Sequence, residues 1–168
     1  LIMEGITRNI ERPIKDLNGG IFTIYLLPYV KYSRSQITIE DQKITAFPGS
    51  EIYKVYASTK NFTQSTETEG GAVFYTQNFT LEIPKTEIGS QVYRLVNKKY
   101  RAIIQDNNDN WRMLGLFNGL KCSYTNSTGT NKTDFSGYSI TFEGKEDRQA
   151  LYTNSITEGL TPTEIYNF

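Results

Sequence analysis

The chain contains no histidine and a single cysteine, Cys122. Histidine is the commonest general base and the commonest transition-metal ligand, so its absence removes the usual Ser–His and Cys–His nucleophile pairs. One cysteine cannot form a disulfide within the chain, and Cys122 has no histidine to activate it as a nucleophile. We therefore expect no catalytic residue, no metal site and no cofactor, and we do not expect an enzyme.

The sequence also lacks an excess of charge and a long apolar run. Its 18 basic side chains balance its 18 acidic ones, whereas a protein that grips nucleic acid carries a basic excess or stripe. The longest apolar run, from Ile21 to Val30, is interrupted by Thr23 and Pro28 and is too short for a spanning helix. These features disfavour membrane insertion and stable nucleic-acid binding.

What the chain has in abundance is residues that favour strands. It contains 12 tyrosines and 9 phenylalanines together with many threonines. Its 168 residues are enough for one domain with a substantial core. We predict a single, mostly antiparallel β domain over residues 1–168, with an N-terminal arm (1–18) and a flexible or docking C-terminal arm (148–168).

The clearest strand signal runs from Gly71 to Lys85. Its apolar residues share one parity: Val73, Tyr75, Phe79, Leu81 and Ile83. Only Gln77 breaks that series. A period of two over this length predicts a long, half-buried strand. The preceding segment ends in a polar turn containing glycine, which predicts a hairpin.

Two further patterns predict local structure. Between Thr86 and Lys99 the apolar residues recur at helical spacing, which predicts one helix over residues 87–98. Asn118–Gly119 separates two apolar segments, and this dipeptide is a strong signal for a tight hairpin turn.

The segment from Asp106 to Asn110 has two possible interpretations. Asp106, Asn108 and Asn110 occupy the first, third and fifth positions of a calcium-binding loop. The sixth position needs glycine and has Trp111, and the twelfth needs glutamate and has Phe117. Strand-like patterns flank the segment, so we predict a polar hairpin tip.

Two other functional interpretations are weaker. Glu143 with Glu146 or Asp147 could form the carboxylate pair of a glycosidase, but no local pattern distinguishes these residues from a solvated strand end. Exposed tyrosines, asparagines and Trp111 could instead stack on sugars, although core packing explains most aromatic residues equally well.

Four fragments occur in an order that resembles a known family. They are GGIFTIYL, GAVFYTQNFTLEIPK, YRAIIQDNNDNWRMLGLFNGL and GYSITFEGKE, and the resemblance covers roughly residues 19–147. The chain resembles small structural proteins encoded among the tail genes of tailed bacteriophages. The resemblance implies a tail-tube or tail-ring subunit, with a β-sandwich or half-barrel and one helix, assembled as hexameric rings whose inner strands join into a continuous barrel.

The resemblance also implies partners and positions. We expect self-association, contacts with other tail proteins, passage of DNA without sequence-specific binding, and a place in the virion, which is assembled in the bacterial cytoplasm. The residues expected at the interface between subunits are Gln64, Ser65, Thr66, Glu67, Thr68 and Glu69, in a polar loop. The residues expected to face the lumen are Thr76, Asn78, Thr80 and Glu82. The alternative is a carbohydrate-binding β-sandwich module of a phage fibre or secreted protein.

Overall fold

The computed structural model describes residues 19–47, 52–55, 57–84, 95, 98–153 and 162–164. This part of the chain is mainly β, which confirms the predicted fold class. The elements are β1 (Ile21–Pro28), the 3-10 turn η1 (Arg34–Gln36), β2 (Thr38–Glu40), β3 (Lys43–Ala46), β4 (Ile52–Val55), β5 (Thr59–Glu69), β6 (Ala72–Pro84), β7 (Lys99–Asp106), β8 (Trp111–Leu114), β9 (Leu120–Ser127), β10 (Gly137–Glu146), β11 (Leu151–Tyr152) and β12 (Pro162–Glu164).

All these strands belong to one hydrogen-bonded sheet of 12 strands. The sheet is mixed, because β11 runs parallel to β3 and β12 runs parallel to β4, while the other pairs are antiparallel. The hydrogen bonding therefore does not confirm a sandwich of two separate sheets.

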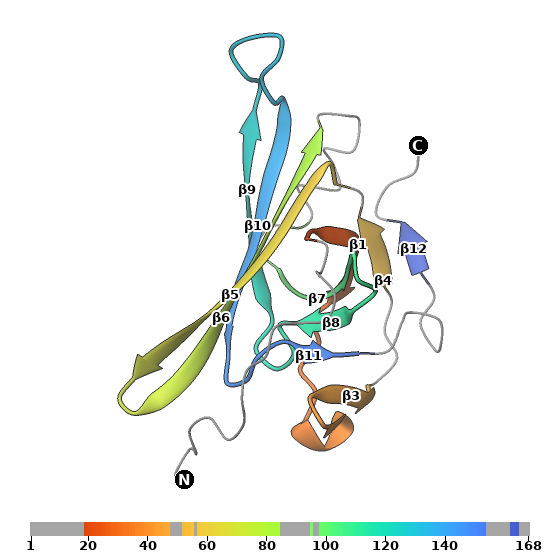
Figure 1. Ribbon diagram of the computed structural model, residues 1–168, viewed down its shortest axis with the longest axis vertical. Coiled ribbons are helices and arrows are strands. Elements are labelled where there is room, and N and C mark those ends of the chain that lie inside the picture. The colour runs from red at the N-terminus through yellow and green to blue at the C-terminus, as the bar shows by residue number, and fades with distance from the viewer. Residues whose placement is uncertain are drawn as a thin grey trace, which may run out of the picture.

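Strand β7 is the place where the sheet divides. It pairs with β1 along one edge, and along the other edge with β8 and, at Lys99 and Tyr100, with β9. From β7 the strand order runs through β9, β10 and β6 to β5 in one direction, and through β8, β11 and β3 to β2 in the other. We call β5, β6, β10 and β9 the long layer, and β1, β4, β7 and β8 the short layer. Figure 1 shows the two long hairpins crossing the molecule beside the short layer.

Buried apolar side chains lie on both faces of β7. Ala102 and Ile104 belong to a larger core, which they share with Phe79, Leu81 and other residues of the long layer. Ile103 points to the other face and joins a smaller core. The smaller core consists of Leu27, Ile37, Ile44, Ile52, Ile103, Met113, Leu116 and Leu151. Two-sided burial explains why the apolar residues Ala102, Ile103 and Ile104 of β7 are consecutive and do not alternate with polar ones.

The predicted hairpin of β5 and β6 is confirmed. The two strands pair from Thr59 opposite Glu82 to Glu69 opposite Ala72, without a shift in register. Along β6, Phe79, Leu81 and Ile83 of the alternating series are buried in the larger core, whereas Val73 and Tyr75, nearer the hairpin turn, are only half-buried. Gln77, the exception in the pattern, lies on the same face and is only 2% exposed.

The prediction that Asn118–Gly119 forms a hairpin turn between paired strands is wrong. β8 pairs with β7 and β11, whereas β9 pairs with β10 and β7. Residues 115–119, which we call the junction loop, instead carry the chain from the short layer to the long layer. The Gly119 N–H donates to the Gly115 carbonyl (3.1 Å). Both glycines have positive φ, 68° and 75°, a conformation that glycine adopts without strain.

Several predicted segments fall partly or wholly outside the described residues. The helix predicted over residues 87–98 lies almost entirely outside them, although Leu95 is helical and buried. The N-terminal arm, residues 1–18, lies outside them as well. Two pieces of the C-terminal arm (148–168) are described, residues 148–153 and 162–164, and each contains a strand. β11 pairs with β8 and β3, with Leu151 buried, and β12 pairs with β4.

The larger core makes a direct prediction about stability. Phe142 is 0% exposed, stacks on Phe79 (ring centroids 5.5 Å apart) and meets the edge of Tyr100 (6.0 Å). Phe142→Ala should lower the free energy of unfolding by about 3–5 kcal/mol, because it removes buried apolar surface and leaves a cavity. Denaturant unfolding of the purified protein measures this. Phe22→Ala, at a side chain that is 63% exposed, should change stability by less than about 0.5 kcal/mol; equal effects would contradict the assigned core.

Candidate assembly surface

The long layer is apolar on one face and polar on the other. Its four strands pair in unbroken antiparallel register, so alternate residues of each strand share a face. The apolar face packs on the larger core. The opposite face, which we call the polar face, consists of Thr59, Asn61, Thr63, Ser65 and Glu67 of β5, Phe74, Thr76, Asn78, Thr80 and Glu82 of β6, Ser139, Thr141, Glu143 and Lys145 of β10, and Lys121, Ser123, Thr125 and Ser127 of β9. None of these side chains is buried.

The residues predicted to face a lumen lie together on the polar face. Thr76, Asn78, Thr80 and Glu82 alternate along β6. Each is half-buried, because β5 and β10 flank β6 on both sides. Asn78, for example, has Thr63 and Glu143 as its direct neighbours. The structure thus brings the four residues onto one surface, and their lumenal role stays a prediction.

Charges on the polar face are few and nearly balanced. It carries three glutamates, Glu67, Glu82 and Glu143, and two lysines, Lys121 and Lys145. Lys145 Nζ lies 3.1 Å from Glu67 Oε2, but both side chains are at least half exposed, so this ion pair contributes little to stability. The hydrogen bond from Lys145 is the main reason that the pKa of Glu67 lies below its ordinary value. The face has no basic cluster of the kind that holds phosphates.

Both outer edges of the long layer lack a strand partner within the described part of the chain. β5 pairs only with β6. β9 pairs with β10, and its other edge meets β7 only at Leu120 and Lys121, which leaves that edge open over residues 122–127. The first residues of β5 lie near β1, where Lys60 Nζ donates to the Phe22 carbonyl (3.1 Å). Open edges of this length expose rows of N–H and C=O groups that can pair with another strand.

The segment predicted as a polar docking loop is the second half of β5 and not a loop. Residues 64–69 pair with β6, and the turn is confined to Gly70 and Gly71, whose φ angles are 58° and 83°. This part of the hairpin buries neither face of β5, so its sequence shows no alternation that would reveal a strand. The exposed residues are Ser65, Thr66, Glu67, Thr68 and Glu69. Gln64 differs, because its Oε1 accepts a hydrogen bond from the Ala150 N–H (2.8 Å) of the same chain.

The two hairpins of the long layer extend past the rest of the molecule. Figure 1 shows the turn between β5 and β6 at the lower left and the loop between β9 and β10 at the top, so the two tips point in opposite directions. In the β9–β10 loop, Asp134 Oδ2 accepts hydrogen bonds from the Thr130 and Asn131 N–H groups (3.0 and 2.8 Å). Both hydrogen bonds lower the pKa of Asp134, and the one from the Asn131 N–H has the larger effect. Each tip is therefore available for contact with another molecule.

Buried polar side chains fix the long layer to the rest of the fold through the junction loop. Gln77 Oε1, from β6, accepts a hydrogen bond from the Gly115 N–H (2.8 Å). Arg101, from β7, is 1% exposed, and its Nε donates to the Leu116 carbonyl (2.8 Å). Its Nη1 donates to the Val30 carbonyl (2.7 Å). Because buried donors and acceptors are costly when unpaired, these bonds restrict the loop to one conformation.

Arg101 is a buried cation enclosed by aromatic rings. Its guanidinium carbon lies 4.5 Å from the ring centroid of Tyr29, 5.0 Å from that of Tyr32 and 5.4 Å from that of Phe47. Burial lowers the pKa of Arg101, while the nearby tyrosines and Glu146 oppose that change. Cation–π contacts are strongest where water is excluded, so the rings offset part of the cost of burying this charge.

Glu146, at the end of β10, holds the other side of the junction loop. It is 1% exposed, and its Oε1 accepts hydrogen bonds from the N–H groups of Phe117 (3.1 Å) and Asn118 (2.8 Å). Its Oε2 is buried without a hydrogen-bond partner. Burial raises the pKa of Glu146 above its ordinary value of 4.5, the two backbone bonds and Arg101 lower it, and Asp147 raises it. The net effect favours the protonated form.

The other candidates from the sequence are placed as follows. Glu143 and Glu146 lie on opposite faces of β10, so they do not converge on a shared substrate position. Trp111 stacks on Tyr25 (centroids 6.0 Å apart, planes at 24°) and packs against the smaller core. It is therefore not an isolated exposed ring. Burial raises the pKa of Cys122 to about 12, so its thiol stays protonated and unreactive at neutral pH.

The polar segment that follows β7 is a hairpin tip, as predicted. β7 and β8 pair up to Gln105 opposite Trp111. Asp106 Oδ1 accepts hydrogen bonds from the Asn108 and Asn110 N–H groups (2.8 and 2.9 Å). The carboxylate thus satisfies the backbone of its own turn. Within the described residues, no group of three or more histidine, cysteine or acidic side chains is arranged to hold a metal ion.

Comparisons with known proteins supply no relative. No protein-family model, no curated protein and no solved structure matches the chain. Of the helices in the described part of the chain, none has the length and apolar character needed to cross a membrane. The functional argument therefore depends on the geometry of the long layer alone.

The buried carboxyl of Glu146 predicts a pH dependence. Its raised pKa means that folding favours the protonated form, so its contribution to stability is complete below the unfolded-state pKa and is lost as the pH rises through the folded-state pKa. Glu146→Gln keeps an acceptor for the Phe117 and Asn118 N–H groups and cannot ionise. The variant should therefore gain stability relative to the wild type as the pH is raised from 4 towards 7. Urea unfolding of both proteins across that pH range measures the difference in their free energies of unfolding. If this difference stays constant with pH, or changes in the opposite direction, the raised pKa assigned to Glu146 is wrong.

Proposed function

We propose that the chain is a structural subunit of a phage tail that assembles edge to edge into a ring or tube. The observation that carries the proposal is the long layer, a four-stranded sheet with one continuous polar face and with two edges that have no strand partner among the described residues. In this proposal the open edge of β5 in one subunit pairs with the open edge of β9 in the next. The proposed location is the virion, after assembly in the bacterial cytoplasm.

The two edges suit a head-to-tail contact. β5 and β9 lie at opposite sides of the same sheet, so a contact between them joins unlike surfaces and can repeat from copy to copy. Such contacts close into a ring when the rotation between copies permits it. Closure also removes edges that would otherwise aggregate. Every copy would add its four long strands to a shared barrel.

The polar face suits the inner wall of such a barrel. Its side chains are mainly hydroxyls and amides, with three glutamates and two lysines. A wall that lets DNA pass must stay wet and must not hold phosphates, and a basic surface would hold them. The apolar face of the same sheet is already covered by the short layer within each subunit, so the polar face is the one left for the lumen.

The structure offers less support for the carbohydrate-binding alternative. That interpretation needs aromatic rings exposed on one surface. Trp111, the ring on which it depends most, stacks on Tyr25 at the smaller core. The polar face carries one aromatic side chain, Phe74, among its 18 residues.

Electron microscopy of the purified chain tests assembly directly. Negative-stain images over a range of protein concentrations should show rings or tubes of uniform diameter, because open edges pair once copies meet often enough. Uniform small particles at every concentration would rule the proposal out.

Disulfide trapping tests which edges meet. In a Cys122→Ser background, one cysteine is placed on β5 (Thr63 or Ser65) and one on β9 (Ser123 or Thr125). At least one of these four pairs should give a ladder of dimers, trimers and larger species after oxidation of assembled protein, because adjacent strands bring facing residues within disulfide reach. A non-reducing gel shows the ladder.

A matched control uses Thr63→Cys with Thr141→Cys. Thr141 lies on β10, an inner strand of the long layer, so a neighbouring copy cannot reach it along the edge. This pair should give no ladder. Assembled particles that yield no ladder from any β5–β9 pair, or the same ladder from the control, would show that the contact lies elsewhere.

A further inference from the structure

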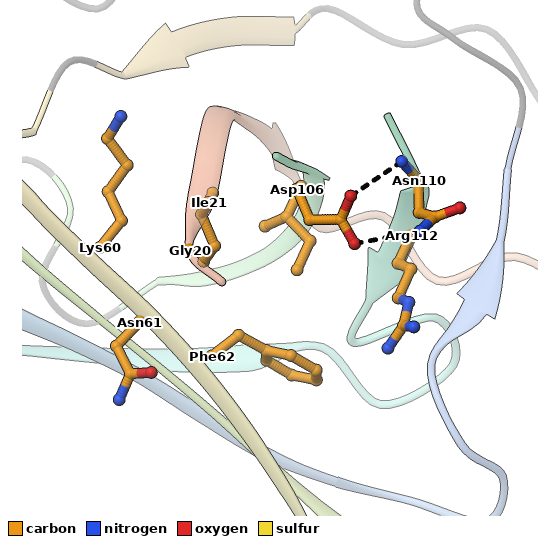
Figure 2. Close-up of a pocket in the computed structure, with 9 residues that line it drawn as sticks. Gly20, Ile21, Lys60, Asn61, Phe62, Asp106, Asn110 and Arg112 are labelled. Carbon is orange, nitrogen blue, oxygen red and sulfur yellow. Dashed lines mark hydrogen bonds between the residues drawn. The ribbon is translucent and has the colours of Figure 1, made fainter. Parts of the chain in front are cut away.

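A small pocket opens where β1, β5, β7 and β8 come together. Its volume is about 170 Å³, below the range of about 300–1,000 Å³ that is usual for sites of drug-sized ligands. The apolar residues of its wall are Ile21, Phe62 and Ile104, and the charged ones are Lys60, Asp106 and Arg112. Figure 2 shows Arg112 descending from β8 with its guanidinium directed toward the Phe62 ring.

Arg112 has an incomplete set of hydrogen bonds within the described part of the chain. A guanidinium carries five N–H donors and stays charged at any ordinary pH. One Nη of Arg112 donates to the Tyr152 hydroxyl (3.2 Å), and the guanidinium lies 5.0 Å from the centroid of that ring. The Nε–H is buried and has no partner. Among the described residues, no carboxylate lies within ion-pair distance of Arg112.

The carboxylate in the pocket wall, Asp106, forms no ion pair with Arg112. Asp106 Oδ1 accepts the backbone N–H groups of Asn108 and Asn110, and its Oδ2 accepts from Asn110 Nδ2 (3.3 Å). Figure 2 shows these bonds holding the carboxylate toward Asn110. Its charge is thus spread over the donors of its own turn, which weakens its repulsion of an incoming anion.

A second cation adds to the positive field. The Lys60 ammonium donates to the Phe22 carbonyl and points away from Arg112 in Figure 2, so Lys60 lines the pocket with its aliphatic stem. Burial lowers the pKa of Lys60, and the charge of Lys54 lowers it further. Among the described residues Lys60 has no acidic partner within ion-pair distance. The region therefore holds positive charge that its own acids do not balance.

We propose that this pocket binds a carboxylate group carried on a small apolar body. The guanidinium of Arg112 supplies the paired donors that match a carboxylate, and Phe62, Ile21 and Ile104 contact the body. The carboxylate comes either from a free small acid or from an acidic side chain of another copy. The proposal does not depend on the phage-tail assignment.

Equilibrium dialysis of the full-length chain against radiolabelled benzoate tests the proposal. Benzoate should bind saturably at one site per chain, whereas benzamide, which has the same shape without the charge, should bind at least about tenfold more weakly, because it cannot form the charge-assisted pair. Equal binding of the two compounds, or no saturable binding of benzoate, overturns the proposal. This comparison needs no variant.

Variants then assign the site. Arg112→Met should reduce the affinity for benzoate by at least about tenfold. The affinity of Arg112→Lys should lie between those of Arg112→Met and the wild type, because lysine keeps the charge but loses the paired geometry. Arg34→Gln is the control, since Arg34 is exposed and pairs with Asp147 outside the pocket. A wild-type affinity in Arg112→Met, with the fold verified by circular dichroism, places the binding elsewhere and overturns the proposal.

Comparing benzoate binding by assembled and unassembled protein distinguishes the two possible sources of the carboxylate, a free small acid and an acidic side chain of another copy. If another copy supplies the carboxylate, assembled particles take up no benzoate and unassembled chains take up one equivalent. If the ligand is a free acid, both forms bind it equally. Either result agrees with a carboxylate site and identifies its occupant.

Discussion

The hydrogen bonding of the junction loop is the constraint on which the rest of the structure depends. Gln77, Arg101 and Glu146 come from β6, β7 and β10, and all three bind the backbone of residues 115–118. They tie the long layer to the short layer at the one connection between β8 and β9. A Cβ at Gly144 would lie 2.4 Å from the Gly119 carbonyl oxygen, so β10 also approaches this loop too closely for any side chain.

This anchoring determines which surfaces of the long layer are left open. Its apolar face is fixed against the larger core, which leaves the polar face and the two outer edges for partners. A rigid attachment matters for assembly, because a small change in tilt of one layer would be repeated in every copy of a ring. The buried polar groups thus connect the internal fold to the proposed tube or ring.

Regular alternation made the β class and the β5–β6 hairpin predictable from the sequence. The junction loop was not predictable, because Asn118–Gly119 favours a hairpin turn and only the pairing of β8 and β9 with different partners excludes it. Gln77 did carry a signal, since a polar residue in a buried series needs a partner, but its partner Gly115 lies 38 positions away. The second half of β5 was missed as a strand because both of its faces are exposed there.

Hydrogen exchange measured before and after assembly tests the central claim most directly. The account predicts that outward-facing amides of β5 and of residues 122–127 in β9 exchange rapidly in the free subunit and become protected in the assembled form. Amides of β6 and β10, which are paired on both sides within the subunit, should change little. Assembly that leaves the β5 and β9 amides unprotected would contradict edge-to-edge pairing.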